Sequence, residues 1–178
     1  RPCAVIGTLG NGFPGALLPS PNTTPEAVTL HRDLARFAAA GAEACAMEVS
    51  SIALDQGRTN GACIRVGVFT NLTRDHLEYH RTMEAYAAAK ARLFDSPGMV
   101  AAVMNLDDEL GRALAQSLRG RLRVIGYTLE GRQGGDTRLA AEGLTMDDRG
   151  LRFSLDGETV SAPLAGRFNA SNVLAVIG

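Results

Sequence analysis

Short runs of apolar and β-branched residues alternate along the first part of the chain with segments whose apolar residues recur every three or four positions. The short runs predict buried strands and the periodic segments predict helices. This alternation is typical of βαβ units that build a parallel sheet. The predicted strands cover residues 4–8, 44–49, 64–70, 100–105 and 122–127.

Two helices have clear end signals in the sequence. Thr24 is a favourable N-cap residue, Pro25 suits the first helical position, and Gly41 marks the end of the apolar periodicity. A second helix is predicted over residues 107–118, with acidic residues in its first turn where the helix dipole favours them.

A chain reversal is expected near His80 and Arg81, between a helical turn over residues 75–79 and a separate helix over residues 83–94. Thr82 is a good N-cap residue for the second of these helices. One straight helix would place residues 76 and 90 about 21 Å apart, because each residue adds about 1.5 Å. The reversal lets side chains of both segments approach one site.

The character of the chain changes after the last predicted strand. Glycines there separate short segments in which apolar and polar residues alternate, and this pattern predicts a small antiparallel meander near residues 137–163. A helical pattern resumes at Asn169. The predicted fold class is α/β, with a mostly parallel sheet flanked by helices. The missing initiator Met and the apolar run at the end lead us to expect a fragment.

Bulk composition excludes several classes of function. The chain has 178 residues, is 46% hydrophobic and 21% charged, and has a net charge of −1, as expected for one soluble globular domain. The sequence has no basic stripe of the kind that binds nucleic acid. No apolar run reaches the roughly 20 residues that a membrane helix needs. Three cysteines in apolar stretches are interpreted as buried thiols in a reducing compartment, which indicates the cytoplasm.

Candidate chemistry lies at the predicted carboxyl ends of strands, where open α/β sheets bind ligands. Glu48 follows the strand over residues 44–49 and His76 follows the strand over residues 64–70, so both are expected on one edge from neighbouring strands. The pair suits a divalent metal. An alternative remains open, in which Glu48 pairs with an arginine and His76 caps a helix.

Lys90 is the only lysine among 18 basic residues, and it lies on the apolar side of its predicted helix. Burial favours the neutral amine of a lysine, and a neutral amine can add carbon dioxide to form a carbamate, an anion suited to Mg²⁺. The alternative is a lysine that extends its ammonium group to solvent along an apolar surface.

A third candidate is the polar run Asn22, Thr23 and Thr24, which precedes a predicted helix N-terminus, a natural site for phosphate or carboxylate. The glycine-rich residues 7–12 are a weak dinucleotide signal, because no helix is predicted directly after them. No Gly-x-x-x-x-Gly-Lys-Ser/Thr motif occurs in the chain.

Several of these segments, in the same order and spacing, resemble the Mur ligase family, and within it the branch that adds the third amino acid, meso-diaminopimelate or L-lysine, to UDP-N-acetylmuramoyl-L-alanyl-D-glutamate in peptidoglycan synthesis. The matching segments are residues 7–12, 22–25, 46–51, 69–80, 83–90, 105–109 and 166–172. One departure is Ile52, where the family usually has histidine.

The resemblance implies an ATP-dependent amide ligase that works through an acyl phosphate, with Mg²⁺ and ATP as cofactors. Its partners are the UDP-sugar-peptide and a free amino acid, and the family suggests a monomer. The implied site residues are the metal-binding and catalytic Glu48, His76 and carbamylated Lys90, the substrate-binding Asn22, Thr23, Thr24, Ser50, Gln56 and Arg58, and the nucleotide-binding Asn169 and Asn172.

The resemblance also implies that residues 1–178 are part of the central ATP-binding domain. Its first strand and phosphate loop, the N-terminal uridine-binding domain and the C-terminal domain are expected outside this chain, so the chain alone is expected to be inactive. Three alternatives stay open: a folylpolyglutamate or cyanophycin-type ligase, a binding module without activity, and a metal-dependent hydrolase using Glu48, His76, His80 and a carbamylated Lys90.

Overall fold

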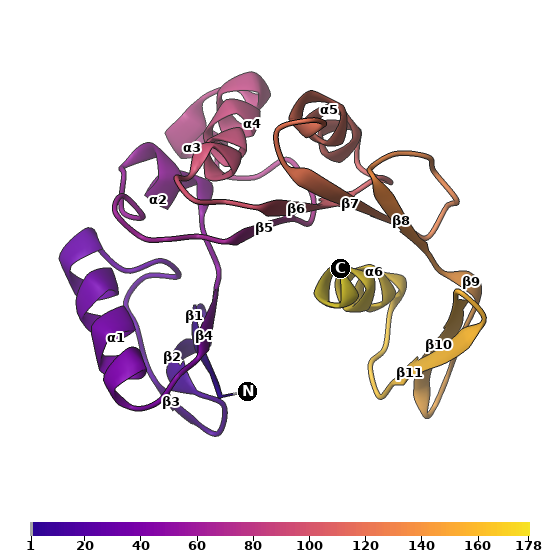
Figure 1. Ribbon diagram of the computed structural model, residues 1–178, viewed down its shortest axis with the longest axis horizontal. Helices are drawn as coiled ribbons and strands as arrows, with labels where there is room; N and C mark the ends of the chain where they lie inside the picture. The colour runs from indigo at the N-terminus through magenta and orange to yellow at the C-terminus, as the bar shows by residue number, and fades with distance from the viewer. Residues whose placement is uncertain (1) are drawn as a thin grey trace. The chain divides into compact units, whose positions relative to one another are not determined.

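The computed structural model describes residues 2–178, which divide into two compact units (Figure 1). The first unit comprises Arg1–Cys63 and Asp75–Asp95, and the second comprises Ile64–Arg74 and Ser96–Gly178. Within the described residues, the first unit contains one sheet and the second contains two. No helix within residues 2–178 is both long and apolar enough to cross a membrane.

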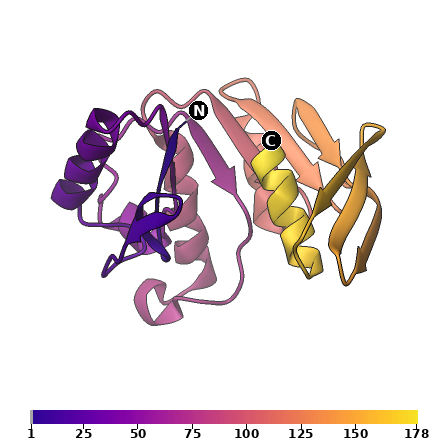
Figure 2. The ribbon, with the colours of Figure 1, turned by 90° about the horizontal axis from the view of Figure 1, so that it is seen from below.

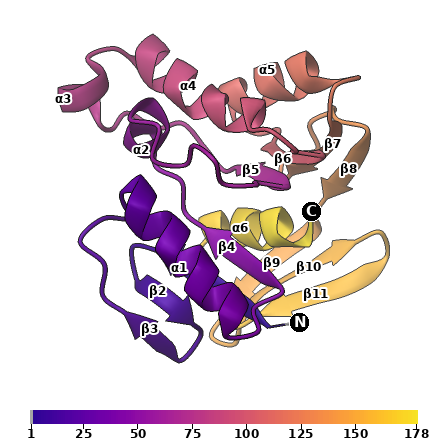
Figure 3. The ribbon, with the colours of Figure 1, turned by 60° about the vertical axis from the view of Figure 1, so that its left-hand side comes forward.

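The first unit is built on a four-stranded sheet with the order β3-β2-β1-β4. β1 pairs in parallel with β4 and antiparallel with β2, so the carboxyl ends of β1 and β4 meet at one edge. Figure 3 shows α1 lying along this sheet, and Leu30 and Phe37 of this helix pack with Ala4 and Ile6 of β1. The elements are β1 (Cys3–Gly7), β2 (Gly10–Phe13), β3 (Ala16–Leu18), α1 (Ala27–Ala39) and β4 (Ala44–Met47).

The hairpin of β2 and β3 is absent from the sequence prediction, because its strands are short and rich in glycine. Gly10 and Gly12 have φ angles of 122° and 151°, and a Cβ atom at either would lie within 2.6 Å of a β3 carbonyl oxygen. The glycines therefore allow β3 to approach β2 closely. Because a hairpin and not a helix follows β1, the structure supports no dinucleotide-binding turn there.

Short helices complete the first unit: α2 (Ser51–Asp55), α3 (Leu77–His80), α4 (Met83–Ala91) and the 3₁₀ helix η1 (Arg92–Asp95). The predicted reversal is confirmed. Arg81 has a φ angle of 67°, and the Thr82 hydroxyl accepts a hydrogen bond of 3.1 Å from the Ala85 N–H, which makes Thr82 the N-cap of α4.

The second unit is built on a parallel sheet with the order β5-β6-β7-β8. Figure 1 shows α5 on one face of this sheet and α6 on the other. The predicted strands and the predicted second helix are all present. The elements are β5 (Val66–Phe69), β6 (Ala101–Asn105), α5 (Glu109–Leu118), β7 (Arg123–Thr128), β8 (Thr137–Ala140) and α6 (Arg167–Ile177).

The predicted meander is an antiparallel sheet of β9 (Glu142–Asp147), β10 (Gly150–Leu155) and β11 (Glu158–Ala162). One face of this sheet packs on α6, as Figure 2 shows, and its alternating apolar residues enter the core of the unit. That core contains Val103, Tyr127, Leu151, Phe153, Leu155, Ala170, Leu174 and Ala175.

Two sequence-based expectations are corrected. The strands before Glu48 and His76 are not neighbours, because β4 pairs with β1 and β5 pairs with β6 in a different sheet. Thr24 does not cap α1, whose N-cap residue is Glu26. Neither the strand that pairs with β4 nor the group that bonds to the Thr24 hydroxyl can be predicted from a local pattern, because both lie far away in the chain.

The cysteines also differ from the prediction. Cys63 is exposed, whereas Cys3 and Cys45 are partly buried on the adjacent strands β1 and β4. Burial is the main cause that raises the pKa of Cys45 to about 11, so its thiol stays protonated at neutral pH.

Close packing of α5 on the sheet predicts a strong effect for Gly111→Ala. A Cβ atom there would lie 1.9 Å from the Asn105 carbonyl oxygen. Such overpacking costs up to about 3 kcal/mol, and we expect the thermal unfolding midpoint of the full-length protein to fall by about 5 °C or more. The exposed control Ser117→Ala on the same helix is expected to shift it by less than about 2 °C. Equal midpoints for both variants would contradict the packing argument.

Candidate functional site

The carboxylate of Glu48 lies at the edge where β1 and β4 end. Its Oε2 atom accepts a hydrogen bond of 3.1 Å from the Thr8 N–H and one of 2.8 Å from the Thr8 hydroxyl. Thr8 follows β1 directly and Glu48 follows β4 directly, so the parallel pairing of the strands brings the two residues together. Glu48 pairs with no arginine within residues 2–178, where its carboxylate partner is Thr8.

Gly7 provides the space beneath this carboxylate. A Cβ atom at Gly7 would lie 2.9 Å from Cδ and 3.0 Å from Oε1 of Glu48. The absence of a side chain at Gly7 thus lets the carboxylate lie directly over the end of β1.

The polar run before α1 reaches the same edge. The Thr23 and Thr8 hydroxyl oxygens are 3.0 Å apart. Thr24 is 1% exposed, and its hydroxyl donates a hydrogen bond of 2.9 Å to the Glu48 carbonyl and accepts one of 3.0 Å from the Ser50 N–H. Thr24 therefore joins the loop to the segment after β4, and Thr23 places a hydroxyl beside the carboxylate. Asn22 lies partly buried in the same loop.

A guanidinium group supports this loop from behind. Arg58 donates to the Thr24 carbonyl at 3.0 Å, to Gln56 Oε1 at 2.9 Å, and pairs with Glu26 at 3.0 Å. Ser50 caps α2, because its hydroxyl accepts a hydrogen bond of 3.1 Å from the Ala53 N–H. These contacts bring five of the six predicted substrate-binding residues together near the ends of β1 and β4, and Asn22 precedes Thr23 in the same loop.

His76 and Lys90 meet at a different feature of the first unit, the ring of Tyr86. The His76 ring lies edge-on to it with centroids 5.8 Å apart, and the Lys90 Nζ atom is 5.1 Å from its centroid. Lys90 is partly buried and lies against an aromatic face, which agrees with the predicted inward side of the helix. His76 occupies the N-cap position of α3 with a φ angle of 53°, but its side chain makes no capping hydrogen bond.

His80 connects this aromatic group to the strand end. Its ring stacks on Tyr86 with centroids 5.1 Å apart and an interplanar angle of 14°. Its Nε2 atom is 2.8 Å from the hydroxyl oxygen of Ser51, which begins α2 three residues after Glu48. Burial, and then the charge of Asp75, raises the pKa of Tyr86, so its phenol stays protonated near neutral pH.

The contacts thus form two groups, one around Glu48 and Thr8 and one around Tyr86, and the Ser51–His80 contact links them. Within residues 2–178 no three His, Cys, Asp or Glu side chains lie close enough together to hold a metal ion by themselves. Those four residue types do not include lysine or its carbamate, so a site that uses a carbamylated Lys90 is compatible with this finding.

The donor chemistry around Glu48 fits Mg²⁺. This cation takes oxygen ligands and is bound in proteins by one or two carboxylates together with water. Glu48, Thr8 and Thr23 supply a carboxylate and two hydroxyls, and the Oε1 atom accepts no hydrogen bond within residues 2–178.

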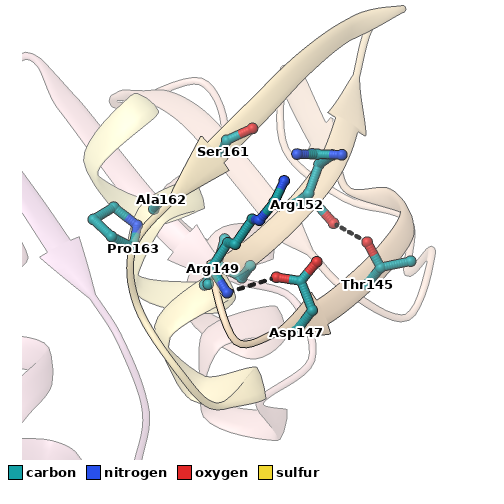
Figure 4. A pocket seen from close by; sticks show the side chains of 9 residues that line it. Thr145, Asp147, Arg149, Arg152, Ser161, Ala162 and Pro163 are labelled. Carbon is teal, nitrogen blue, oxygen red and sulfur yellow. Dashed lines mark hydrogen bonds between the residues drawn. The ribbon is translucent and has the colours of Figure 1, made fainter.

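The predicted nucleotide-binding residues lie in the second unit, on α6. Asn169 donates a hydrogen bond of 2.7 Å to the Ala165 carbonyl, and its Oδ1 atom accepts one of 3.4 Å from Asn172. Asn172 lines a hollow of about 390 Å³ whose other walls are mainly valine and alanine. A second hollow of about 190 Å³, lined by Arg149 and Arg152 on the β9–β11 sheet (Figure 4), contains no predicted site residue.

Sequence reasoning missed Thr8 and Tyr86. Thr8 was detectable, because it follows a predicted strand end just as Glu48 does. Tyr86 had no such signal, since a tyrosine within a helix is usually a packing residue and only the folded chain shows which groups surround its ring.

The fold is an α/β domain with polar side chains at the ends of two parallel strands, and the chain belongs to the Mur ligase family: residues 1–178 match the Mur ligase middle domain. It is 49% identical over 178 residues to the UDP-N-acetylmuramoyl-L-alanyl-D-glutamate–2,6-diaminopimelate ligase of Alkalilimnicola ehrlichii. It is also 49% identical over 181 residues to the ligase of the same name from Xanthomonas campestris pv. campestris.

A solved structure of a UDP-N-acetylmuramoyl-L-alanyl-D-glutamate–2,6-diaminopimelate ligase matches 99% of this chain with a TM-score of 0.88 and 38% identity. The chain covers 37% of that structure, and it spans about 35% of the length of the curated relatives. The predicted family and the predicted α/β fold are both confirmed.

Proposed function

We propose that the full-length protein containing this chain is an ATP-dependent ligase that adds meso-diaminopimelate to UDP-N-acetylmuramoyl-L-alanyl-D-glutamate in peptidoglycan synthesis. The observation that carries the proposal is the 49% identity, over 98% of the chain, to a ligase named for this reaction. The carboxylate and hydroxyls at the strand end around Glu48 support it, because such oxygens would hold the Mg²⁺ that neutralises phosphoryl charge.

In this reaction the terminal carboxylate of the UDP-sugar-dipeptide attacks the γ-phosphorus of ATP, and ADP leaves. The amine of diaminopimelate then attacks the acyl phosphate, loses a proton and displaces inorganic phosphate. Magnesium ions, when bound, neutralise the phosphoryl and carboxylate oxygens. Glu48 would hold one ion with the help of the Thr8 and Thr23 hydroxyls, and His76 and a carbamylated Lys90 would hold the other or position the reacting groups.

The loop and helix around the strand end bind the UDP-sugar-peptide in this proposal. Asn22, Thr23 and Ser50 offer polar groups near the carboxyl ends of β1 and β4. Thr24, Gln56 and Arg58 act chiefly by holding that loop in place, since the Thr24 hydroxyl and the Arg58 guanidinium already bond to protein atoms.

Asn169 and Asn172 contact the adenine of ATP in this proposal. They are three residues apart on α6, so their amides lie on one face of the helix, and the hydrogen bond between them orients both. The apolar walls of the hollow beside Asn172 suit the face of a purine base.

The phosphate loop, the uridine-binding domain and the domain that selects the amino acid belong to parts of the protein outside residues 1–178. The chain by itself is then inactive. We further infer a cytoplasmic monomer, because both nucleotide substrates are cytoplasmic metabolites and the Mur ligase family suggests a monomer.

The test is a ligase assay of the full-length protein with ATP, Mg²⁺ and the UDP-sugar-dipeptide. Phosphate release and a product with the mass of the diaminopimelate adduct are expected only when all components are present. L-Lysine is expected to react at least about 100-fold less efficiently in kcat/KM, as expected when a polar group of the substrate is missing from its site. Preference for L-lysine would overturn the choice of amino acid, and no reaction with either would overturn the function.

A further inference from the structure

The ring of Tyr86 lies between the two residues proposed to act together. Tyr86 is 5% exposed, its ring forms a T-shaped pair with the His76 ring, and the Lys90 Nζ atom lies 5.1 Å from its centroid. His76 and Lys90 are 14 positions apart on two different helices, α3 and α4, so no local geometry sets their relative position. The aromatic ring is their shared contact.

The ring of His80 holds Tyr86 in turn. The near-parallel stack has a centroid distance of 5.1 Å, and the Tyr79 ring packs edge-on against His80 at 4.9 Å. His80 is 8% exposed and its Nε2 atom contacts the Ser51 hydroxyl at 2.8 Å. Aromatic pairs of this kind stabilise a fold beyond the effect of the area that they bury.

Two further polar contacts join α3 and η1, the 3₁₀ helix that directly follows α4, to α2. The Tyr79 hydroxyl donates to Asp55 Oδ2 at 2.9 Å, and the Arg92 guanidinium pairs with Asp55 Oδ1 at 2.9 Å. Together with the Ser51–His80 contact, they connect the segment that follows Glu48 to the helices that carry His76 and Lys90.

We propose that Tyr86 and His80 are positioning residues, which hold the His76 imidazole and the Lys90 side chain in register with the Glu48 strand end. The inference rests on the proposed function, because it assigns these residues to a two-metal site. A site of this kind has to be held within about 0.5 Å of its productive geometry, and a lysine stem with four rotatable bonds does not do so by itself. A planar ring fixed on one side by a buried histidine supplies that constraint.

The main test compares Tyr86→Leu with Tyr86→Phe in the full-length protein. Leucine keeps much of the buried volume but removes the planar ring, and we expect the Mg²⁺ concentration for half-maximal activity to rise about tenfold and kcat to fall about tenfold, as for misplacement of reacting groups. KM for the UDP-sugar-dipeptide is expected to change less than about twofold. Phenylalanine keeps the ring and is expected to restore both quantities to within about threefold of wild type.

Phe94→Leu is the matched control for packing. Phe94 is 3% exposed in η1, in the same unit, and its replacement also removes a buried aromatic ring. It is expected to lower the thermal unfolding midpoint without changing the Mg²⁺ dependence. If Phe94→Leu and Tyr86→Leu shift the Mg²⁺ dependence equally, Tyr86 has only a structural role and the inference is overturned.

Ser51→Ala and His80→Phe test the link to the strand end with small changes. Each removes the Ser51–His80 contact, and His80→Phe keeps an aromatic ring to stack on Tyr86. We expect each to raise the half-maximal Mg²⁺ concentration by about threefold, and the double variant to add nothing further, because both changes remove one shared contact. Additive effects, or none, would overturn this part of the inference.

A measurement without turnover separates this inference from the proposed function. Mg²⁺ alone is expected to raise the thermal unfolding midpoint of the wild-type protein, and the Mg²⁺ concentration needed is expected to be about tenfold higher for Tyr86→Leu. If the wild type binds Mg²⁺ in this way but makes no ligated product, the function is wrong and the positioning role stands. If the wild type is active and Tyr86→Leu matches it in both assays, only the positioning role fails.

Discussion

Lys90→Arg is expected to lower kcat of the full-length ligase by about 100- to 1,000-fold, which is the effect of removing one preorganised charged group from an active site. Arginine keeps the positive charge and the contact with the Tyr86 ring but cannot form a carbamate, because its guanidinium stays protonated. Lys90→Ala removes the amine altogether. If Lys90→Arg lowers kcat as much as Lys90→Ala does, the cationic charge of Lys90 is not the functional feature. The measurement is the rate of phosphate release at saturating substrates.

Carbon-13 NMR provides the control for this prediction. Wild-type protein equilibrated with ¹³C-labelled bicarbonate is expected to show a carbamate resonance that is absent from Lys90→Arg. A Lys90→Glu variant, which carries a permanent carboxylate on a shorter side chain, is expected to recover part of the activity. Wild-type rates in Lys90→Arg would exclude a carbamate role.

Glu48→Gln is expected to lower kcat/KM by about 100-fold or more and to weaken Mg²⁺ binding, so that more Mg²⁺ is needed for half-maximal activity. Glutamine keeps the size of the side chain and an oxygen that accepts the hydrogen bonds from Thr8, so the strand end is expected to remain folded. What changes is the negative charge beside the Thr8 and Thr23 hydroxyls. The measurement is a Mg²⁺ titration of the ligase rate, with the thermal unfolding midpoint recorded for each variant.

Glu142→Gln is the matched control. Glu142 is exposed on β9, and its substitution removes the same charge from the second unit. It is expected to leave kcat/KM within about twofold of wild type. If Glu48→Gln behaves like Glu142→Gln, the carboxylate at the strand end holds no functional ion.

Local signals explain the parts of the fold that sequence reasoning predicted correctly. The apolar runs of the parallel strands, the acidic start of α5 and the Thr82 cap of α4 each act over a few residues, so each is visible in a short window. The glycine-rich hairpin after β1 was missed, because it depends on the close approach of β3.

The candidate site was also predicted only in part, since some of its features depend on local signals and others on contacts between distant segments. The rule that ligands bind at strand ends located Glu48, and the order of motifs identified the family. The same rule did not show that β4 and β5 belong to different sheets, because pairing depends on contacts between distant segments.

The sequence by itself determined the succession of strands and helices, the polar loop before α1, the reversal before α4 and the presence of one lysine on an apolar helix face. These features depend on backbone preferences and hydrophobic periodicity, which act within a few residues. Only the tertiary structure decided that Thr24 bonds to the segment after β4 and that His76, His80 and Lys90 surround one tyrosine ring. Those contacts form only when packing brings separate elements together, and no short-range pattern specifies them.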